Sequence, residues 1–368
     1  MMRRCVTVFL IFILFVLFFV PVQASRNDTY YTDIILDECD KDTENLLEDI
    51  GITDGSYADL LELDFSSFVK MLTDLCRKYL REPLVCVSTS TGLLLLMLFL
   101  KSLFGEDARF SSFIESISVI FLLITVLNPI GDVINHILQV NASVNDLIKV
   151  LIPILAAIIT ASGNPTLAIC LQSACLGVGQ VLSALLVKLL PPFCAVYASL
   201  AACSAINSNT DMGGYAKLIK KIFTFVLSLA SAVFSAILSV KNIIAVSADS
   251  VAMKGAKFFV GNAVPIVGGA LSDSLSTVIA SITLLRSTVG MVAVIVLCVM
   301  VLPVLIELLL WKAGMILLSA VSDSILQSRS SALFNSFSDL ISVMIAVTAF
   351  QAFICIISVA SVVLIARM

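Results

Sequence analysis

Long apolar runs separated by short polar stretches dominate the chain from residue 84 onward. Most approach the roughly 20 residues that a helix needs to cross the hydrocarbon core of a bilayer. The runs occupy residues 84–104, 113–134, 147–161, 167–187, 189–206, 222–240, 288–311 and 340–365. This pattern predicts an all-α, polytopic membrane protein with about eight transmembrane helices, six within 84–240 and two within 288–368.

Turn signals order the first spans. The sequence Ser-Gly-Asn-Pro at 162–165 is so short that it predicts a tight antiparallel return. Asn128, Pro129 and Gly131 lie near the end of the second run, and His136 follows them. We therefore expect His136 in a loop between the second and third spans.

The region 241–287 interrupts this pattern. Its second half, 258–286, is apolar and long enough to span a bilayer, but it contains helix-breaking and polar residues. These are Gly261, Asn262, Pro265, Gly268, Gly269 and Asp273. A broken helix at membrane depth is tolerated only where it is buried in protein or lines a wet cavity. We expect 241–287 to form interfacial helix plus a broken or re-entrant segment, with these six residues as candidates for a pore, gate or assembly site.

Two other acidic residues are secondary candidates. Glu307 is the one acid inside a clear span, where ionisable groups are costly and often functional. Because Trp311 and Lys312 follow closely, we expect Glu307 to lie near the interface and to pair with Lys312 rather than serve a proton relay. Asp323 lies in 317–340, which mixes apolar and polar residues and predicts an amphipathic interfacial helix.

A short pentad around Asp323 resembles the one around Asp273. Residues 271–275 read Leu-Ser-Asp-Ser-Leu, and 321–325 read Val-Ser-Asp-Ser-Ile. The similarity indicates either an internal repeat or two helix N-termini that use Ser and Asp as caps. Both alternatives place the two acids near helix starts.

Small side chains recur every fourth residue in the run 222–240. Ser231, Ser235 and Ser239 would let another helix approach closely, which is typical of packing between membrane helices. The interface lies either within one subunit or between two subunits, and in the second case the protein would be a homo-oligomer. A polar pore wall is the alternative.

The N-terminus has the pattern of an export signal. Arg3 and Arg4 precede an apolar core and a small-residue cleavage pattern, which predicts a signal peptide at 1–24, with an uncleaved first helix as the alternative. The next segment, 25–83, has helical apolar spacing and holds 15 of the 26 acidic residues. We expect this acidic helical segment outside the cytoplasm, and the basic cluster at 217–221 inside it.

Composition and missing motifs narrow the function. The chain has 368 residues, is 60% hydrophobic and only 13% charged, and shows no basic patch that would bind nucleic acid. It contains one histidine and no phosphate-binding loop of the form G-x-x-x-x-G-K-[ST]. Its ten cysteines do not have the spacing of a metal site. A disulfide between Cys39 and Cys76 is left undecided by the sequence. We predict no catalytic residue, metal or cofactor.

The run Phe-Val-Gly-Asn-Ala-Val-Pro at 259–265 and its continuation to Arg286 resembles the central signature of the stage III sporulation protein AE family. The resemblance lies at Gly261, Pro265, Gly268, Gly269 and Asp273 and continues over the rest of the chain. It implies a non-enzymatic membrane component of a multiprotein channel or secretion-like complex. That complex would lie in the mother-cell membrane around the forespore. Its implied partners are an ATPase and ring-forming proteins from the same operon, together with membrane lipid.

Two other classes compete with this interpretation. A self-contained secondary transporter would place its substrate site at the broken helix 258–286, but such transporters usually carry matched broken helices in two halves. An intramembrane enzyme is disfavoured by the single histidine and by the lack of paired intramembrane acids.

Overall fold

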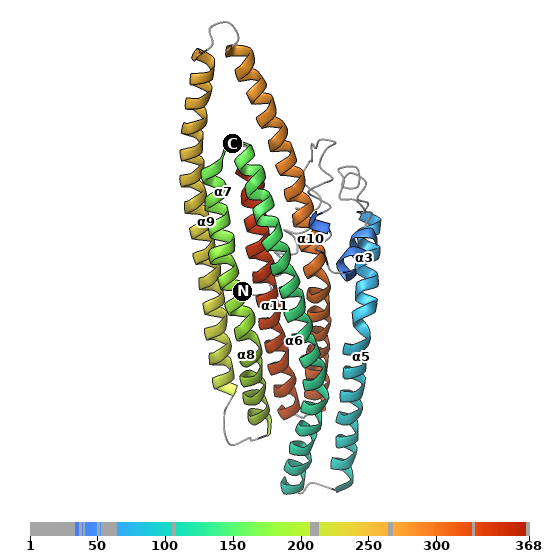
Figure 1. Ribbon diagram of the computed structural model, residues 1–368. Coiled ribbons are helices and arrows are strands. Elements are labelled where there is room, and N and C mark those ends of the chain that lie inside the picture. Colours follow the sequence, from blue (N-terminus) through green and yellow to red (C-terminus); the bar gives the residue numbers. More distant parts are fainter. Residues whose placement is uncertain are drawn as a thin grey trace.

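A computed structural model of the protein describes residues 34–36, 39, 41–49, 52, 65–104, 108–206, 213–263, 268–325 and 328–365. Within these ranges the chain is helical and contains no strand, which confirms the all-α prediction. The elements are α3 (Lys41–Asp49), α5 (Phe65–Phe104), α6 (Ala108–Ala161), α7 (Pro165–Gln172), η1 (Ser173–Gly179), α8 (Gln180–Ile206), α9 (Gly213–Ala263), α10 (Gly268–Ser324) and α11 (Ser328–Ile365). The long helices lie side by side in an elongated bundle (Figure 1). The predicted signal peptide lies outside the described residues.

Six helical stretches in the described part are long and apolar enough to cross a membrane. They are fewer than the eight predicted because two pairs of runs lie in continuous helical stretches. The second and third runs both belong to α6, and the fourth and fifth belong to the stretch from α7 through η1 to α8. At about 1.5 Å per residue, the 54 residues of α6 extend for about 80 Å, well beyond a hydrocarbon core of about 30 Å.

The difference in the number of spans arises because prolines do not end these helices. Pro129 and Pro153 lie inside α6, and Pro191 and Pro192 lie inside α8. Packed neighbours and local adjustments let a membrane helix continue past a proline. The expectation of a loop at His136 is therefore wrong, because that residue lies inside α6.

The predicted return at 162–165 is confirmed. The backbone N–H of Gly163 donates to the Thr160 carbonyl over 3.0 Å, and that of Asn164 donates to the Ile159 carbonyl over 3.2 Å. Gly163 has a φ of 86°, a conformation that glycine adopts without a steric penalty. The turn reverses the chain between α6 and α7.

Two helices form the centre of the bundle. In their most apolar 18 residues, α10 is 89% buried and α11 is 78% buried. The corresponding fraction in the other four candidate spans is 17–33%. α10 packs against α5, α6, α9 and α11, while α11 also packs against α6, α8 and α9. Large apolar side chains such as Phe99 and Phe225 remain exposed on the outer helices, as contact with lipid requires.

The stretch 317–340 differs from its prediction. α10 continues to Ser324 and α11 begins at Ser328, so most of this stretch belongs to the ends of two core helices and not to a separate interfacial helix. Its buried apolar residues, including Leu333 and Phe337, face the core. The polar residues that suggested an interfacial helix lie mostly where the two helices end and begin.

The short helix α3 packs against α5 and α10. Leu47 is buried, whereas Asp42, Glu44, Glu48 and Asp49 are exposed. The described part of the acidic segment is thus helical, with an acidic outer face.

Candidate functional site between the membrane helices

His136 of α6 and Glu307 of α10 form a hydrogen-bonded pair inside the bundle. His136 Nδ1 and Glu307 Oε2 are 2.5 Å apart, and the side chains are 29% and 8% exposed. Both residues lie near the middle of candidate spans, 113–161 and 289–324. A carboxylate in such a position is costly without a partner, and intramembrane ionisable groups usually serve function. The pair is therefore the first candidate site.

Aromatic side chains complete this site. The Tyr79 ring of α5 stacks on the His136 ring, with centroids 5.9 Å apart. Lys78 lies 5.5 Å from the centre of the Tyr79 ring, and its Nζ is 3.7 Å from Asp42 of α3. Polar and aromatic groups therefore extend from the acidic helix α3 to the buried pair, and the site joins α5, α6 and α10.

The structure gives Glu307 a partner other than the expected Lys312. Residues five apart on a helix point in different directions, whereas those three or four apart share a face. The sequence singled out both His136 and Glu307, but their pairing across 171 residues has no local signal. Trp311, one turn after Glu307, is buried, and its indole nitrogen has no hydrogen-bond partner among the described groups.

The interrupted segment lies at the junction of α9 and α10. Gly261 and Asn262 belong to the last turn of α9, Gly268 and Gly269 begin α10, and Asp273 follows in its second turn. Pro265 lies outside the described residues. Both helices extend beyond the rest of the bundle at this end (Figure 1). The role of these six residues as a pore, gate or assembly site stays a prediction.

Asp323 is exposed near the C-terminal end of α10, so the expectation that it lies near a helix start is wrong. The repeated pentad therefore occupies opposite ends of one helix.

The serine stripe lies beside the buried face of α9. Ser231 and Ser235 are partly buried and Ser239 is exposed, while Phe234 and Leu238 are the buried residues between them. The Ser235 hydroxyl donates to the Ser231 carbonyl of the same helix over 2.9 Å. A packing role for the three serines stays a prediction.

A buried acid that sequence reasoning missed holds the start of α7. Asp249 of α9 is 2% exposed, and its two carboxylate oxygens accept hydrogen bonds from the backbone N–H groups of Thr166 at 3.1 Å and Leu167 at 2.8 Å. The residue before α7, Asn164, makes no side-chain capping bond. A carboxylate at a helix N-terminus satisfies unpaired donors and complements the helix dipole. The only sign of this contact in the sequence was a single acidic residue in a stretch less apolar than the neighbouring runs.

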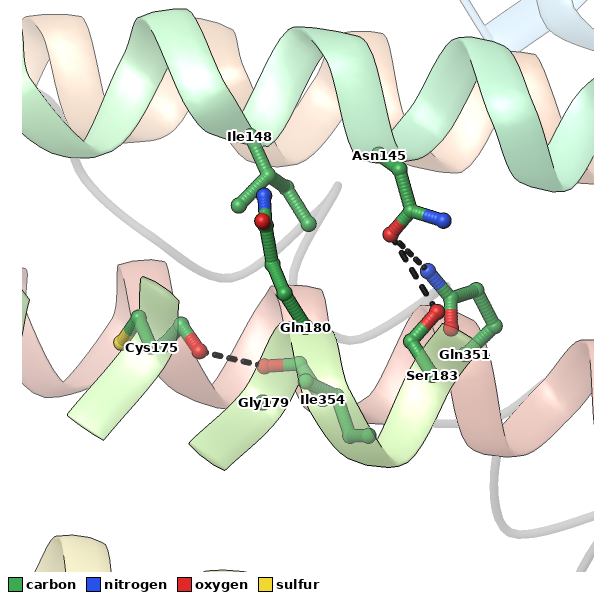
Figure 2. A pocket seen from close by; sticks show the side chains of 9 residues that line it. Asn145, Ile148, Cys175, Gly179, Gln180, Ser183, Gln351 and Ile354 are labelled. Carbon is green, nitrogen blue, oxygen red and sulfur yellow. Dashed lines mark hydrogen bonds between the residues drawn. The ribbon is translucent and has the colours of Figure 1, made fainter. Parts of the chain in front are cut away.

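A second missed cluster joins three helices. Asn145 Oδ1 accepts hydrogen bonds from Ser183 of α8 at 3.2 Å and from Gln351 of α11 at 3.0 Å, as Figure 2 shows. Asn145 itself belongs to α6. Side-chain hydrogen bonds of this kind hold membrane helices together where lipid supplies no hydrophobic drive for their association.

Charged contacts connect the helices elsewhere. Glu115 of α6 accepts from Lys101 of α5 at 3.0 Å and lies 3.5 Å from Arg329 of α11, near the α5–α6 and α10–α11 connections. Lys220 of α9 pairs with Asp339 of α11 at 2.5 Å. The described residues contain no group of three or more His, Cys, Asp or Glu side chains arranged to hold a metal. Cys39 and Cys76 are both described, and they do not form a disulfide.

These features define a polytopic α-helical membrane protein whose spans are joined by buried polar contacts. Sequence comparison gives the particular family: the profile described as stage III sporulation protein AE (spore_III_AE) matches residues 59–366, and the chain belongs to that family. Membership implies a role in sporulation. The matched region includes Gly261 through Asp273, whereas residues 1–58 lie outside it.

A curated relative carries the same name. Stage III sporulation protein AE of Bacillus subtilis (strain 168) is 27% identical over 199 residues, which cover 54% of this chain and 50% of the relative. The chain thus spans about half the length of the curated relative it matches. No solved structure matches the chain.

Proposed function

We propose that this chain is a non-enzymatic integral membrane subunit of a multiprotein channel or secretion-like complex that links mother cell and forespore. The family match over residues 59–366 carries the proposal. The six candidate spans support it, because they make the chain a membrane body rather than a peripheral factor. We place it in the mother-cell membrane around the forespore, with residues 25–83 outside the cytoplasm.

The proposal includes an external energy source. The sequence has no phosphate-binding loop, so any ATP hydrolysis that drives the complex takes place in a separate ATPase. The exposed carboxylates of α3 form an acidic face suited to a basic surface, and ring-forming proteins of the same operon are the proposed partners there. In this scheme the α9–α10 junction lines, gates or assembles the path.

The test replaces glycines at that junction in a spore-forming host that lacks its own copy. Gly268→Leu with Gly269→Leu should abolish late forespore gene expression while membrane insertion stays normal. Gly92→Leu is the matched control, because a Cβ at exposed Gly92 meets no atom within 4 Å. Normal late forespore gene expression in the double variant would contradict a functional role of the α9–α10 junction.

The assembly is tested separately in the same host. Photo-crosslinking from Glu44 or Glu48 of α3 should capture a ring-forming component of the operon, whereas crosslinking from lipid-facing Phe225 should not. Efficient photo-reaction at both α3 positions that captures no ring-forming component would contradict membership of the complex.

A self-contained secondary transporter is the second candidate, and the buried His136–Glu307 pair favours it. This alternative predicts solute uptake by the purified protein in liposomes without partners. Glu307→Gln would then abolish uptake while the protein still inserts and folds.

A further inference from the structure

A small cavity lies between α6, α11 and the segment where η1 passes into α8 (Figure 2). The cavity wall is mostly apolar, and the polar residues that contribute to it are Asn145, Gln180, Ser183, Gln351 and Ser358, with Cys175 beside them. The cavity volume is about 10 Å³. That is close to the space that one water molecule needs.

One donor in the cavity wall lacks a protein partner. Gln180 Nε2 is buried and has no hydrogen-bond partner among the groups that the structure describes. By contrast, Ser183 and Gln351 both donate to Asn145 Oδ1, and the Ser358 hydroxyl donates to the Ile354 carbonyl over 2.6 Å. In Figure 2 the Gln180 amide extends toward Ile148, whose side chain has no acceptor to offer. A buried amide donor left in this state is strongly unfavourable.

The wide helix η1 explains how this donor reaches the cavity. The backbone N–H of Gln180 bonds to the Cys175 carbonyl, five residues earlier, whereas an α-helix would use the residue four earlier. The extra residue in this turn changes the direction in which the side chains of α8 point. Gln180 and Ser183, three apart, consequently share the face that meets α6 and α11.

We propose that this cavity binds one water molecule, which accepts a hydrogen bond from Gln180 Nε2. The side-chain oxygens of Gln180, Ser183 and Gln351 are the acceptors available to its two protons. A bound water with two to four polar partners relieves an unpaired donor at a modest cost in immobilisation. Larger polar solutes do not fit the volume. A cation is disfavoured because the wall has no carboxylate and presents a donor.

Radiolytic footprinting of the full chain in lipid nanodiscs tests the proposal. Hydroxyl radicals formed from a bound water oxidise the side chains next to it, and Cys175 is the cysteine among the residues that line the cavity. Cys194 and Cys298 are the controls, because they are similarly buried, at 3% and 5% exposure against 2%, and do not line it. We expect Cys175 to be oxidised several-fold faster than either control. Equal, slow oxidation of all three would overturn the proposal.

A substitution gives the second readout. Gln180→Met keeps the length of the side chain but removes the donor, so it should reduce Cys175 oxidation to the rate of the controls and lower the Tm. If the cavity is dry, the same variant raises the Tm, because it deletes an unpaired buried donor. Gln172→Met, at an exposed position one turn before the centre of η1, should change neither quantity. If Gln180→Met does not fold, the footprint of the unaltered chain decides.

Discussion

Glu307 depends on a partly exposed histidine from another helix, so the two residues respond differently to substitution. Removing the Glu307 carboxylate leaves an imidazole at the edge of the bundle, where the His136 side chain is 29% exposed. Removing the imidazole leaves a carboxylate that is 8% exposed and cannot hydrate. We therefore expect a larger loss of stability when His136 is replaced than when Glu307 is replaced.

His136→Leu should lower the free energy of unfolding by about 1–3 kcal/mol, because it leaves the buried Glu307 carboxylate without its hydrogen-bond partner. His136→Leu combined with Glu307→Met should recover most of that loss, since replacing both members of a buried pair is often neutral. Unfolding in a denaturing detergent titration measures both values. Asp132→Asn, at an exposed site one turn from His136, is the control. Equal losses in the single and double variants would contradict the pairing.

Gly179 is a second residue with a measurable role. A Cβ there would lie 3.2 Å from Phe234 Cε2 of α9 and 3.3 Å from Ile354 Cγ2 of α11. Gly179→Val should therefore cost about 1–3 kcal/mol through overpacking. Gly177→Val is matched in local structure but meets no atom within 4 Å, so it should change little. Thermal unfolding of the two variants side by side measures the difference, and equal stabilities would show that η1 packs more loosely against its neighbours.

At the scale of elements, α7 depends on a cap from a distant helix. Asp249→Ala should lower stability by about 1–2 kcal/mol and speed hydrogen exchange at the amides of Thr166 and Leu167. Asp249→Asn should keep most of the protection, because Asn caps nearly as well. Mass-spectrometric hydrogen exchange resolves the start of α7 from the rest. Unchanged exchange there in Asp249→Ala would show that another group satisfies these donors.

Hydropathy predicted where the chain is helical and apolar, but it did not predict where helices end or what they touch. The return at 162–165 was predictable because Gly163 and Pro165 act locally. Pro129 and Gly131 carry the same kind of signal, yet α6 continues through them because neighbouring helices stabilise it. Partner choice is a property of tertiary packing, as Asn145 and Gln351, 206 residues apart, illustrate.

At the scale of the molecule, the number of spans decides which side each connection faces. With six spans, the turn at 162–164 lies on the side of the acidic helix α3, opposite the basic cluster at 217–221. With eight, the turn would share the side of that cluster. Labelling the turn at 162–164 is enough to distinguish the two arrangements.

Asn164→Cys, in a background with the native cysteines replaced and expressed in non-sporulating cells, should react with a membrane-impermeant maleimide from outside the intact cells. Lys217→Cys should react only after permeabilisation, because basic clusters stay in the cytoplasm. Protection of both positions in intact cells would restore the eight-span arrangement.

The two buried helices at the centre of the bundle come after the other four spans in chain order, and this has a consequence for biosynthesis. The ribosome delivers α5 through α9 to the bilayer before α10 and α11 exist. The span in α10 is the most apolar of the six candidate spans, so α10 inserts readily once it emerges. Until then Asn145 lacks Gln351, and the centre of the assembly is open to lipid. A prematurely terminated chain keeps that defect, which membrane proteases and chaperones are able to detect.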